Sequence, residues 1–302
     1  MERRKFLTGM ATVPFIMKTG LFEDKSTRPG TPSDSLSRVK MSVNAYSFNT
    51  MLRSGEMSFV DMMEFAADTG LDAVDMTGYY FSNYPSPPAD SEIFEFKRKA
   101  LQLGIDIPWT GVRNDFVNPD DEARKADRDL VRAWLKVSSK LGASIMRVFA
   151  GKDKPAEYSR VEAMSRLIDE LKICAGYSQE EGVMIGLQHH NDFLYTSDEI
   201  IEVLQQVDSK WLGLILDVGS LHKGDSYMEM RKLAPYASYW FIKEHVYPNG
   251  EKTPVNMKKI AEIIKGSNYR GYVSFESLSE GDPKEIVTAM VKDFRIAFQA
   301  MS

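Results

Sequence analysis

The sequence is poor in cysteine, in histidine and in clustered basic residues. Its 302 residues include one cysteine, so no disulfide can form within the chain. Cys174 lies in an apolar stripe of helical spacing, where we expect a buried structural thiol rather than a nucleophile. The chain has four histidines, a net charge of −5 and no arginine cluster, so we expect no nucleic acid as a partner.

Two further signatures are absent. No G-x-G-x-x-G turn and no Walker A motif occurs, so we expect no nucleotide cofactor. No segment has the ~20 consecutive apolar residues that a membrane-spanning helix needs, so we expect no membrane partner. Hydrophobic residues make up 43% and charged residues 27% of the chain, which is typical of globular proteins and argues against disorder over most of its length.

The first 38 residues differ from the rest. Arg3 and Arg4 precede Phe6, a short apolar stretch with a proline follows, and a run rich in Ser, Pro and Gly continues to about Arg38. The paired arginines resemble a twin-arginine signal, which predicts a signal-like, flexible segment over 1–38 and a periplasmic or otherwise exported protein. A basic N-terminus on a cytoplasmic protein is the alternative.

Residues 39–302 read as one domain of alternating strands and helices. Short runs rich in apolar and β-branched residues are each followed by a stretch of helical spacing. Some runs are continuously apolar, as is typical of parallel strands covered on both faces. The strand candidates are Met41–Phe48, Asp72–Thr77, Ile105–Thr110, Ser144–Phe149, Val183–Gln188, Leu212–Asp217, Tyr239–Lys243 and Tyr272–Glu276.

The stretches between these runs carry helix start signals. Ser58 with Asp61, and Thr196 with Glu199, have the spacing of a capping box. Eight strand–helix units without an interrupting second domain favour the α/β class and a single closed (β/α)8 TIM barrel. The alternative is a doubly wound open sheet, which typically has a glycine-rich phosphate-binding turn after an early strand, and this sequence has no such turn.

Polar side chains gather where the predicted strands end. In a closed parallel barrel the carboxyl ends of the strands meet at one rim, and catalytic groups come from several strands at once. We therefore expect the functional site at this rim, which also holds all four histidines. The candidates are Asp75, Trp109, Arg113, Asn114, Arg147, Gln188, His190, Asp217, His222, Lys243, Glu244, His245 and Glu276.

Several candidates have a purely structural alternative. Arg147 either contacts a substrate or pairs with a carboxylate inside the barrel, and Asp75 is a candidate for that partner. Trp109 either packs in the core or forms a platform on which a ring can stack.

Three charged residues at the strand ends are harder to explain by packing. The period of two along a strand predicts that Lys243 faces the interior. Asp217 and Glu276 each directly follow an apolar strand, and a lone buried carboxylate is costly. We expect a metal, a lysine or substrate hydroxyls to satisfy them.

Several stretches near the strand ends carry a family resemblance over about residues 41–300. Those that resemble the xylose isomerase-like barrel superfamily are Gly186–Asn191, Leu216–Gly219, Ile242–Glu244 and Gly271–Glu276. Within it, Val112–Phe116 and Gln188–Asp192 resemble the subgroup of sugar phosphate isomerases/epimerases. The superfamily includes ketose 3-epimerases, hydroxypyruvate isomerase, inosose dehydratase and endonuclease IV. The resemblance implies a small-molecule sugar or sugar derivative as the partner, and a homo-oligomer is compatible with it.

The resemblance also implies a metal site that this chain only partly retains. In the superfamily a divalent metal (Mn, Mg, Zn or Co) is typically held by a glutamate, an aspartate, a histidine and a glutamate on strands five to eight. The implied metal ligands here are Gln188, Asp217 and Glu276, whereas the histidine position falls near Phe241, which cannot ligate. Two carboxylates and an amide form a weak site for a transition metal.

Three interpretations of this departure stay open. His190 or His245 completes a displaced metal site, or Lys243 replaces the metal, or the chain binds a sugar without catalysis.

The chemistry shared by the superfamily implies a sugar isomerase or epimerase that removes a proton next to a carbonyl of a keto-sugar or polyol. We expect Glu276 as the base and Lys243 or a metal as the electrophile, and His190 would bind substrate hydroxyls or relay a proton. Arg113 and Arg147 would hold a carboxylate or phosphate on the substrate. The alternatives are a keto-sugar lyase or dehydratase that works by β-elimination, and a non-catalytic sugar-binding barrel with a degenerate metal site.

Overall fold

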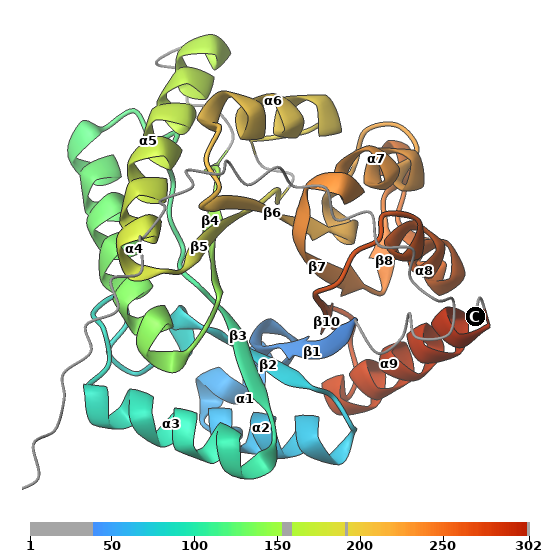
Figure 1. Ribbon diagram of the computed structural model, residues 1–302. Helices are drawn as coiled ribbons and strands as arrows, with labels where there is room; N and C mark the ends of the chain where they lie inside the picture. Colours follow the sequence, from blue (N-terminus) through green and yellow to red (C-terminus); the bar gives the residue numbers. More distant parts are fainter. Residues whose placement is uncertain (1–38, 153–158, 191–192, 301–302) are drawn as a thin grey trace, which may run out of the picture. The chain divides into compact units, whose positions relative to one another are not determined.

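The computed structural model describes residues 39–152, 159–190 and 193–300, which form a closed barrel of parallel strands surrounded by helices (Figure 1). The strand order is β1-β10-β7-β6-β5-β4-β3-β2, and β1 pairs with both β10 and β2, so the sheet has no free edge. The predicted (β/α)8 barrel is therefore confirmed. Its strands are β1 (Lys40–Asn44), β2 (Ala73–Thr77), β3 (Asp106–Gly111), β4 (Ile145–Phe149), β5 (Met184–Gln188), β6 (Leu212–Asp217), β7 (Ala237–Lys243) and β10 (Tyr272–Glu276).

The helices pack their apolar faces against the outside of the barrel (Figure 1). Both predicted capping boxes form: the Ser58 and Thr196 side chains accept hydrogen bonds from the backbone N–H groups of Asp61 and Glu199. Within the described part of the chain, none of the helices is long and apolar enough to cross a membrane. The helices are α1 (Asn49–Ser54), α2 (Phe59–Asp68), α3 (Asp90–Leu103), α4 (Asp121–Leu141), α5 (Arg160–Glu181), α6 (Ser197–Val207), α7 (Ser226–Leu233), α8 (Met257–Gly266) and α9 (Pro283–Gln299).

Two local features differ from the expected pattern. The first strand ends at Asn44, four residues earlier than predicted, because the Asn44 side chain accepts a hydrogen bond of 2.8 Å from the Tyr46 backbone and begins a 3-10 turn. After β7 the chain forms an antiparallel hairpin of β8 (His245–Val246) and β9 (Thr253–Pro254). Two-residue strands are too short to leave a periodic signal in the sequence.

The interior of the barrel is filled by large side chains. Trp109, Ile145, Ile215, Tyr239 and Phe241 form a buried cluster inside the ring of strands, separate from the core between the strands and the helices. This cluster fills the barrel interior below the rim, so a ligand can enter only from the rim formed by the carboxyl ends of the strands. The predicted signal-like segment 1–38 lies outside the described residues.

Candidate active site

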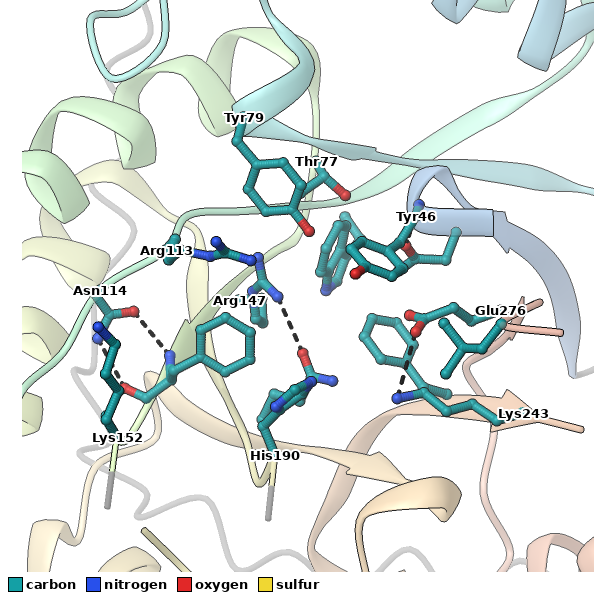
Figure 2. A pocket seen from close by; sticks show the side chains of 17 residues that line it. Tyr46, Thr77, Tyr79, Arg113, Asn114, Arg147, Lys152, His190, Lys243 and Glu276 are labelled. Atoms are coloured by element: carbon teal, nitrogen blue, oxygen red, sulfur yellow. Dashed lines mark hydrogen bonds and ion pairs between the residues drawn. The ribbon is translucent and has the colours of Figure 1, made fainter. Parts of the chain in front are cut away.

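A cavity of about 440 Å³ opens at the carboxyl ends of the strands (Figure 2). Its walls come from the ends of β1, β2, β3, β4, β5, β7 and β10 and from the loops that follow them. The predicted site residues that line it are Trp109, Arg113, Asn114, Arg147, Gln188, His190, Lys243 and Glu276. The other lining residues are Asn44, Tyr46, Thr77, Tyr79, Phe149, Gly151, Lys152, Phe241 and Leu278.

A lysine held between two carboxylates lies at the base of this cavity. The Lys243 Nζ lies 2.8 Å from Asp217 Oδ2 and 3.4 Å from Glu276 Oε1. Lys243 and Glu276 are register partners on β7 and β10, and Asp217 ends the neighbouring strand β6. All three residues are more than nine-tenths buried. The prediction that Lys243 faces the interior is confirmed, and the lysine satisfies both carboxylates.

The two carboxylates have opposite electrostatic environments. Burial alone would raise the pKa of Asp217, but the positive charge of Lys243 outweighs burial and lowers it. For Glu276 burial dominates, and the pKa is raised even though Lys243 opposes the shift. Burial would lower the pKa of Lys243, yet the charges of Asp217 and Glu276 raise it, so the ammonium stays protonated. Glu276 is therefore the more basic carboxylate beside a permanent cation.

Gly219 provides the space that the lysine occupies. A Cβ atom at this position would lie 2.7 Å from Lys243 Cδ, closer than real Cβ atoms approach a neighbour. The Gly219 N–H donates a hydrogen bond of 3.0 Å to Asp217 Oδ1, which leaves Oδ2 facing the lysine. The backbone at Gly219 thus both admits Lys243 and orients its partner carboxylate.

Gln188 connects this cluster to Arg147. Its Nε2 donates a hydrogen bond of 2.7 Å to Asp217 Oδ2, and its Oε1 accepts one of 3.3 Å from Arg147 Nη1. A glutamine can serve both neighbours because one end of its amide donates and the other accepts. Sequence reasoning placed Gln188 at a metal-ligand position; in the structure its amide bridges a carboxylate and a guanidinium.

The Arg147 guanidinium lies among aromatic rings. Its carbon is 4.0 Å from the centroid of Phe149, 5.5 Å from that of Trp109 and 5.8 Å from that of Tyr79. No carboxylate within the described residues pairs with it, so the structural alternative of a salt bridge inside the barrel is not found. Trp109 packs in the interior cluster, which confirms the first of its alternatives, and it also lines the cavity; its role as a stacking platform stays a prediction.

Two adjacent histidines follow β5. His190 lines the cavity with its ring against Phe149 at 5.2 Å, and burial lowers its pKa to about 4. His189 turns away from the cavity lining and accepts a hydrogen bond of 3.1 Å at Nε2 from the Asp217 backbone N–H. Burial lowers its pKa to about 4 as well. Both imidazoles are therefore neutral at neutral pH.

Five predicted site residues do not line the cavity: Asp217, described above, lies directly behind the lining, and four others lie elsewhere. Asp75 is fully buried inside the barrel, where its carboxylate accepts a hydrogen bond of 2.5 Å from the Tyr239 hydroxyl and burial raises its pKa to about 7. Glu244 accepts hydrogen bonds from the backbone of Leu278 and Ser279, because neighbouring strand residues point to opposite faces.

The remaining two of these residues are histidines on the loops beyond the rim. His222 stacks on Tyr247 at 4.3 Å, and His245 lies in the β8–β9 hairpin.

The arrangement does not fit a divalent metal. Within residues 39–152, 159–190 and 193–300, no group of three or more His, Cys, Asp and Glu side chains is placed to hold an ion. The ammonium of Lys243 occupies the space between Asp217 and Glu276, and Phe241 is an apolar lining residue. A cation beside Asp217 would also face the donating end of the Gln188 amide. The donor set therefore matches a buried ammonium rather than a metal ion.

Comparisons with known proteins place this architecture. The chain is 21% identical over 212 residues to the 3-dehydroshikimate dehydratase of Bacillus anthracis, a match that covers 68% of this chain and 71% of the dehydratase. The D-psicose 3-epimerase of Clostridium cellulolyticum H10, solved with D-tagatose, superposes with a TM-score of 0.70 and 18% identity over 86% of this chain and 99% of the epimerase.

A structure of the IOLI protein with a bound zinc atom superposes with a TM-score of 0.67 and 14% identity, over 85% of this chain and 96% of that protein. At such identities, the structural likenesses speak for the fold alone. The family model described as xylose isomerase-like TIM barrel matches residues 63–294, which is most of the chain. This protein therefore belongs to the family of xylose isomerase-like TIM barrels.

Proposed function

We propose that this protein is a sugar isomerase or epimerase that removes a proton next to the carbonyl of a keto-sugar, with a lysine in place of a metal ion. The observation that carries the proposal is the buried ammonium of Lys243, held between Asp217 and Glu276 at the base of the cavity. The D-psicose 3-epimerase of the same fold, solved with D-tagatose, supports a sugar as the substrate.

Lys243 is the proposed electrophile. When a proton leaves the carbon next to a carbonyl, the electron pair of the C–H bond forms a new C=C bond and negative charge develops on the carbonyl oxygen. A fixed cation in a site shielded from water stabilises that charge strongly. An ammonium has three N–H donors, and two face Asp217 and Glu276, which leaves the third for the substrate oxygen.

Glu276 is the proposed base. Its side chain lines the cavity, and burial raises its pKa above the ordinary value. A carboxylate with a raised pKa binds the substrate proton more readily, which improves general base catalysis. Asp217, whose pKa is lowered, remains ionised and keeps the lysine charged.

The fate of the proton distinguishes the reaction types. Its return to the same carbon from the other face gives an epimer, and its return to the former carbonyl carbon gives an isomer. The neutral imidazole of His190 in the cavity wall is suited to pass a proton between the substrate oxygens. If a hydroxyl on the β-carbon leaves instead, the outcome is elimination, and the sequence similarity to 3-dehydroshikimate dehydratase favours this as the second candidate.

Hydrogen exchange tests the proposal directly. The protein is incubated in deuterated water with D-fructose, D-tagatose, L-ribulose, D-fructuronate and 3-dehydroshikimate, and the incorporation of deuterium at carbon is followed by NMR. We expect exchange with at least one of them, at a rate that Glu276→Gln lowers by a factor of about 10² to 10⁴.

The matched control is Glu285→Gln, which makes the same change on the exposed surface of α9 and is expected to leave the rate unchanged. If the parent exchanges no hydrogen with any of these compounds, the barrel binds without catalysis. Equal rates in the parent and Glu276→Gln would refute the role of that residue.

A further inference from the structure

One edge of the Arg147 guanidinium has no partner. Nη1 donates to Gln188, but Nε and Nη2 are buried and make no hydrogen bond within the described part of the chain. The residue is only 4% exposed, so water satisfies these donors poorly. Buried donors are normally paired, and an unpaired set in a native protein calls for an explanation. Here both unpaired donors belong to a side chain that lines the cavity.

The neighbouring residues pack closely against this edge. Gly111 lies beside it, and a Cβ atom there would stand 3.0 Å from Arg147 Nε, so a larger residue would cover the edge. The Tyr79 ring lies over the guanidinium of Arg113 as well as that of Arg147, at 5.4 and 5.8 Å. Figure 2 shows both guanidinium groups on the same side of the cavity, across from Lys243 and Glu276.

The cavity carries more positive than negative charge. Its lining includes the cations Arg113, Arg147, Lys152 and Lys243, whereas Glu276 is the single acidic lining residue within the described chain. Asp217, directly behind the lining, balances a second cation. This surplus stands out in a chain whose net charge is −5. A positive cavity in an acidic protein draws an anionic ligand inward.

The shape of the unpaired edge selects the type of anion. Nε–H and Nη2–H point the same way and match the two oxygens of a carboxylate, which is the bidentate pairing typical of arginine. The rings of Phe149 and Trp109 lie against the guanidinium, with their centroids 4.0 and 5.5 Å from its carbon. A phosphate would bring a third oxygen and a second charge, which the two unpaired donors of this edge do not match.

We propose that the substrate is a sugar acid, a polyhydroxylated keto acid whose carboxylate binds the Nε–Nη2 edge of Arg147. This inference rests on the proposed function only for the reacting end of the molecule; the carboxylate site stands on Arg147 alone. Among the residues that the structure describes, a single side chain, Gln188, links Arg147 by hydrogen bonds to the Lys243–Asp217 pair. The carboxylate therefore lies within a few carbon atoms of the reacting carbonyl.

Binding measurements with one carbon skeleton test the proposal without any need for turnover. D-fructose, D-fructuronate and D-fructose 6-phosphate differ at the terminal carbon, which carries a hydroxyl, a carboxylate or a phosphate. 2-Keto-D-gluconate places the carboxylate next to the keto group instead. By isothermal titration calorimetry with the full chain, we expect at least one of the two acids to bind about tenfold or more tightly than D-fructose.

Variants assign the preference to one side chain. Arg147→Gln is expected to bring the acid and D-fructose within about twofold of one another. Arg147→Lys, which keeps the charge but loses the paired donors, should retain only part of the preference. Arg132→Gln makes the same change as the first variant on the exposed face of α4 and should leave the preference intact. Circular dichroism shows which variants keep the fold, and Arg147→Lys decides the question if Arg147→Gln does not fold.

Each outcome bears on the assignment. If neither acid binds more tightly than D-fructose, or if an acid preference survives Arg147→Lys unchanged, the carboxylate site is refuted. Tighter binding of D-fructose 6-phosphate than of either acid would assign the edge to phosphate and overturn the proposal. Acids that bind through Arg147 but exchange no hydrogen would uphold the carboxylate site while the proposed catalysis fails.

Discussion

Replacing Lys243 by methionine tests the electrostatics of the site in the folding equilibrium. The substitution keeps most of the side-chain volume and removes the only cation within 4 Å of Asp217 or Glu276 in the described chain. Both carboxylates would then remain buried without a counter-charge. Breaking a buried ion pair by removing one partner typically costs about 3–5 kcal/mol. For a barrel of this size that corresponds to a fall in the melting temperature of roughly 6–20 °C.

The loss should depend on pH in a defined direction. In the parent, the lowered pKa of Asp217 contributes stability above its ordinary value of 3.8, and that contribution is lost as the pH falls. Without Lys243, burial raises the pKa of both carboxylates, so the variant folds more easily when they are protonated. The deficit relative to the parent is therefore largest near neutral pH and shrinks toward about pH 5.

Urea unfolding followed by far-UV circular dichroism at about pH 5 and about pH 7.5 measures both effects. The double variant Lys243→Met/Asp217→Asn removes one stranded carboxylate and should recover more than half of the lost stability. Lys258→Met, on the exposed face of α8, is the matched control and should change little. A Lys243→Met protein that unfolds within about 1 kcal/mol of the parent, or with the same deficit at both pH values, would refute the reasoning.

Further predictions concern the same site and the single thiol. Gly219→Ala should displace Lys243 and lower the free energy of unfolding in urea by about 1–3 kcal/mol. Gly266→Ala, at a position with open space around the added Cβ atom, is the control and should not lower it. Equal effects of the two variants would contradict the steric argument. Exchange activity, once measured, should survive dialysis against EDTA within about twofold, and a loss restored by Mn²⁺ would reinstate the metal. The exchange rate should rise with pH through a midpoint above 4.5, because the Glu276 pKa is raised and its ionised form is the base; a midpoint at or below 4.5 would speak against this. Burial raises the Cys174 pKa, so a thiol reagent should react only with the unfolded protein, and rapid reaction with the native form would contradict its burial.

The barrel was predictable because parallel strands leave a strong signal. Seven of the eight strand candidates match the observed strands to within two residues at both ends, and two of these, Leu212–Asp217 and Tyr272–Glu276, match completely. Continuous apolar runs mark buried strands, and a period of two then fixes which residue faces inward. The same period placed Lys243 in the interior. The contact of Lys243 with Asp217 and Glu276 was also predictable, because each of the three residues ends a strand of the same closed sheet.

Contacts that depend on loops and on side-chain orientation were not predictable. Glu244 pairs with backbone N–H groups 34 and 35 residues away, and no local pattern shows such a partner. The orientation of the Gln188 amide follows from two neighbours on different strands. Lys152, Phe149 and Leu278 were missed as lining residues because they carry no motif, although the first two immediately end or follow β4, where the rim rule could have found them.

At the base of the cavity, the positive charge and the stability of the fold depend on the same side chain, Lys243. In a metal site the charge depends on a separate ion. A metal ion comes and goes with its free concentration, so a folded metalloprotein can be empty. Lys243 is part of the polypeptide, so every chain carries this positive charge, and a chelator cannot remove it. The same ammonium ties together the ends of β6, β7 and β10. A variant without this charge would therefore also lose the link between the ends of these three strands.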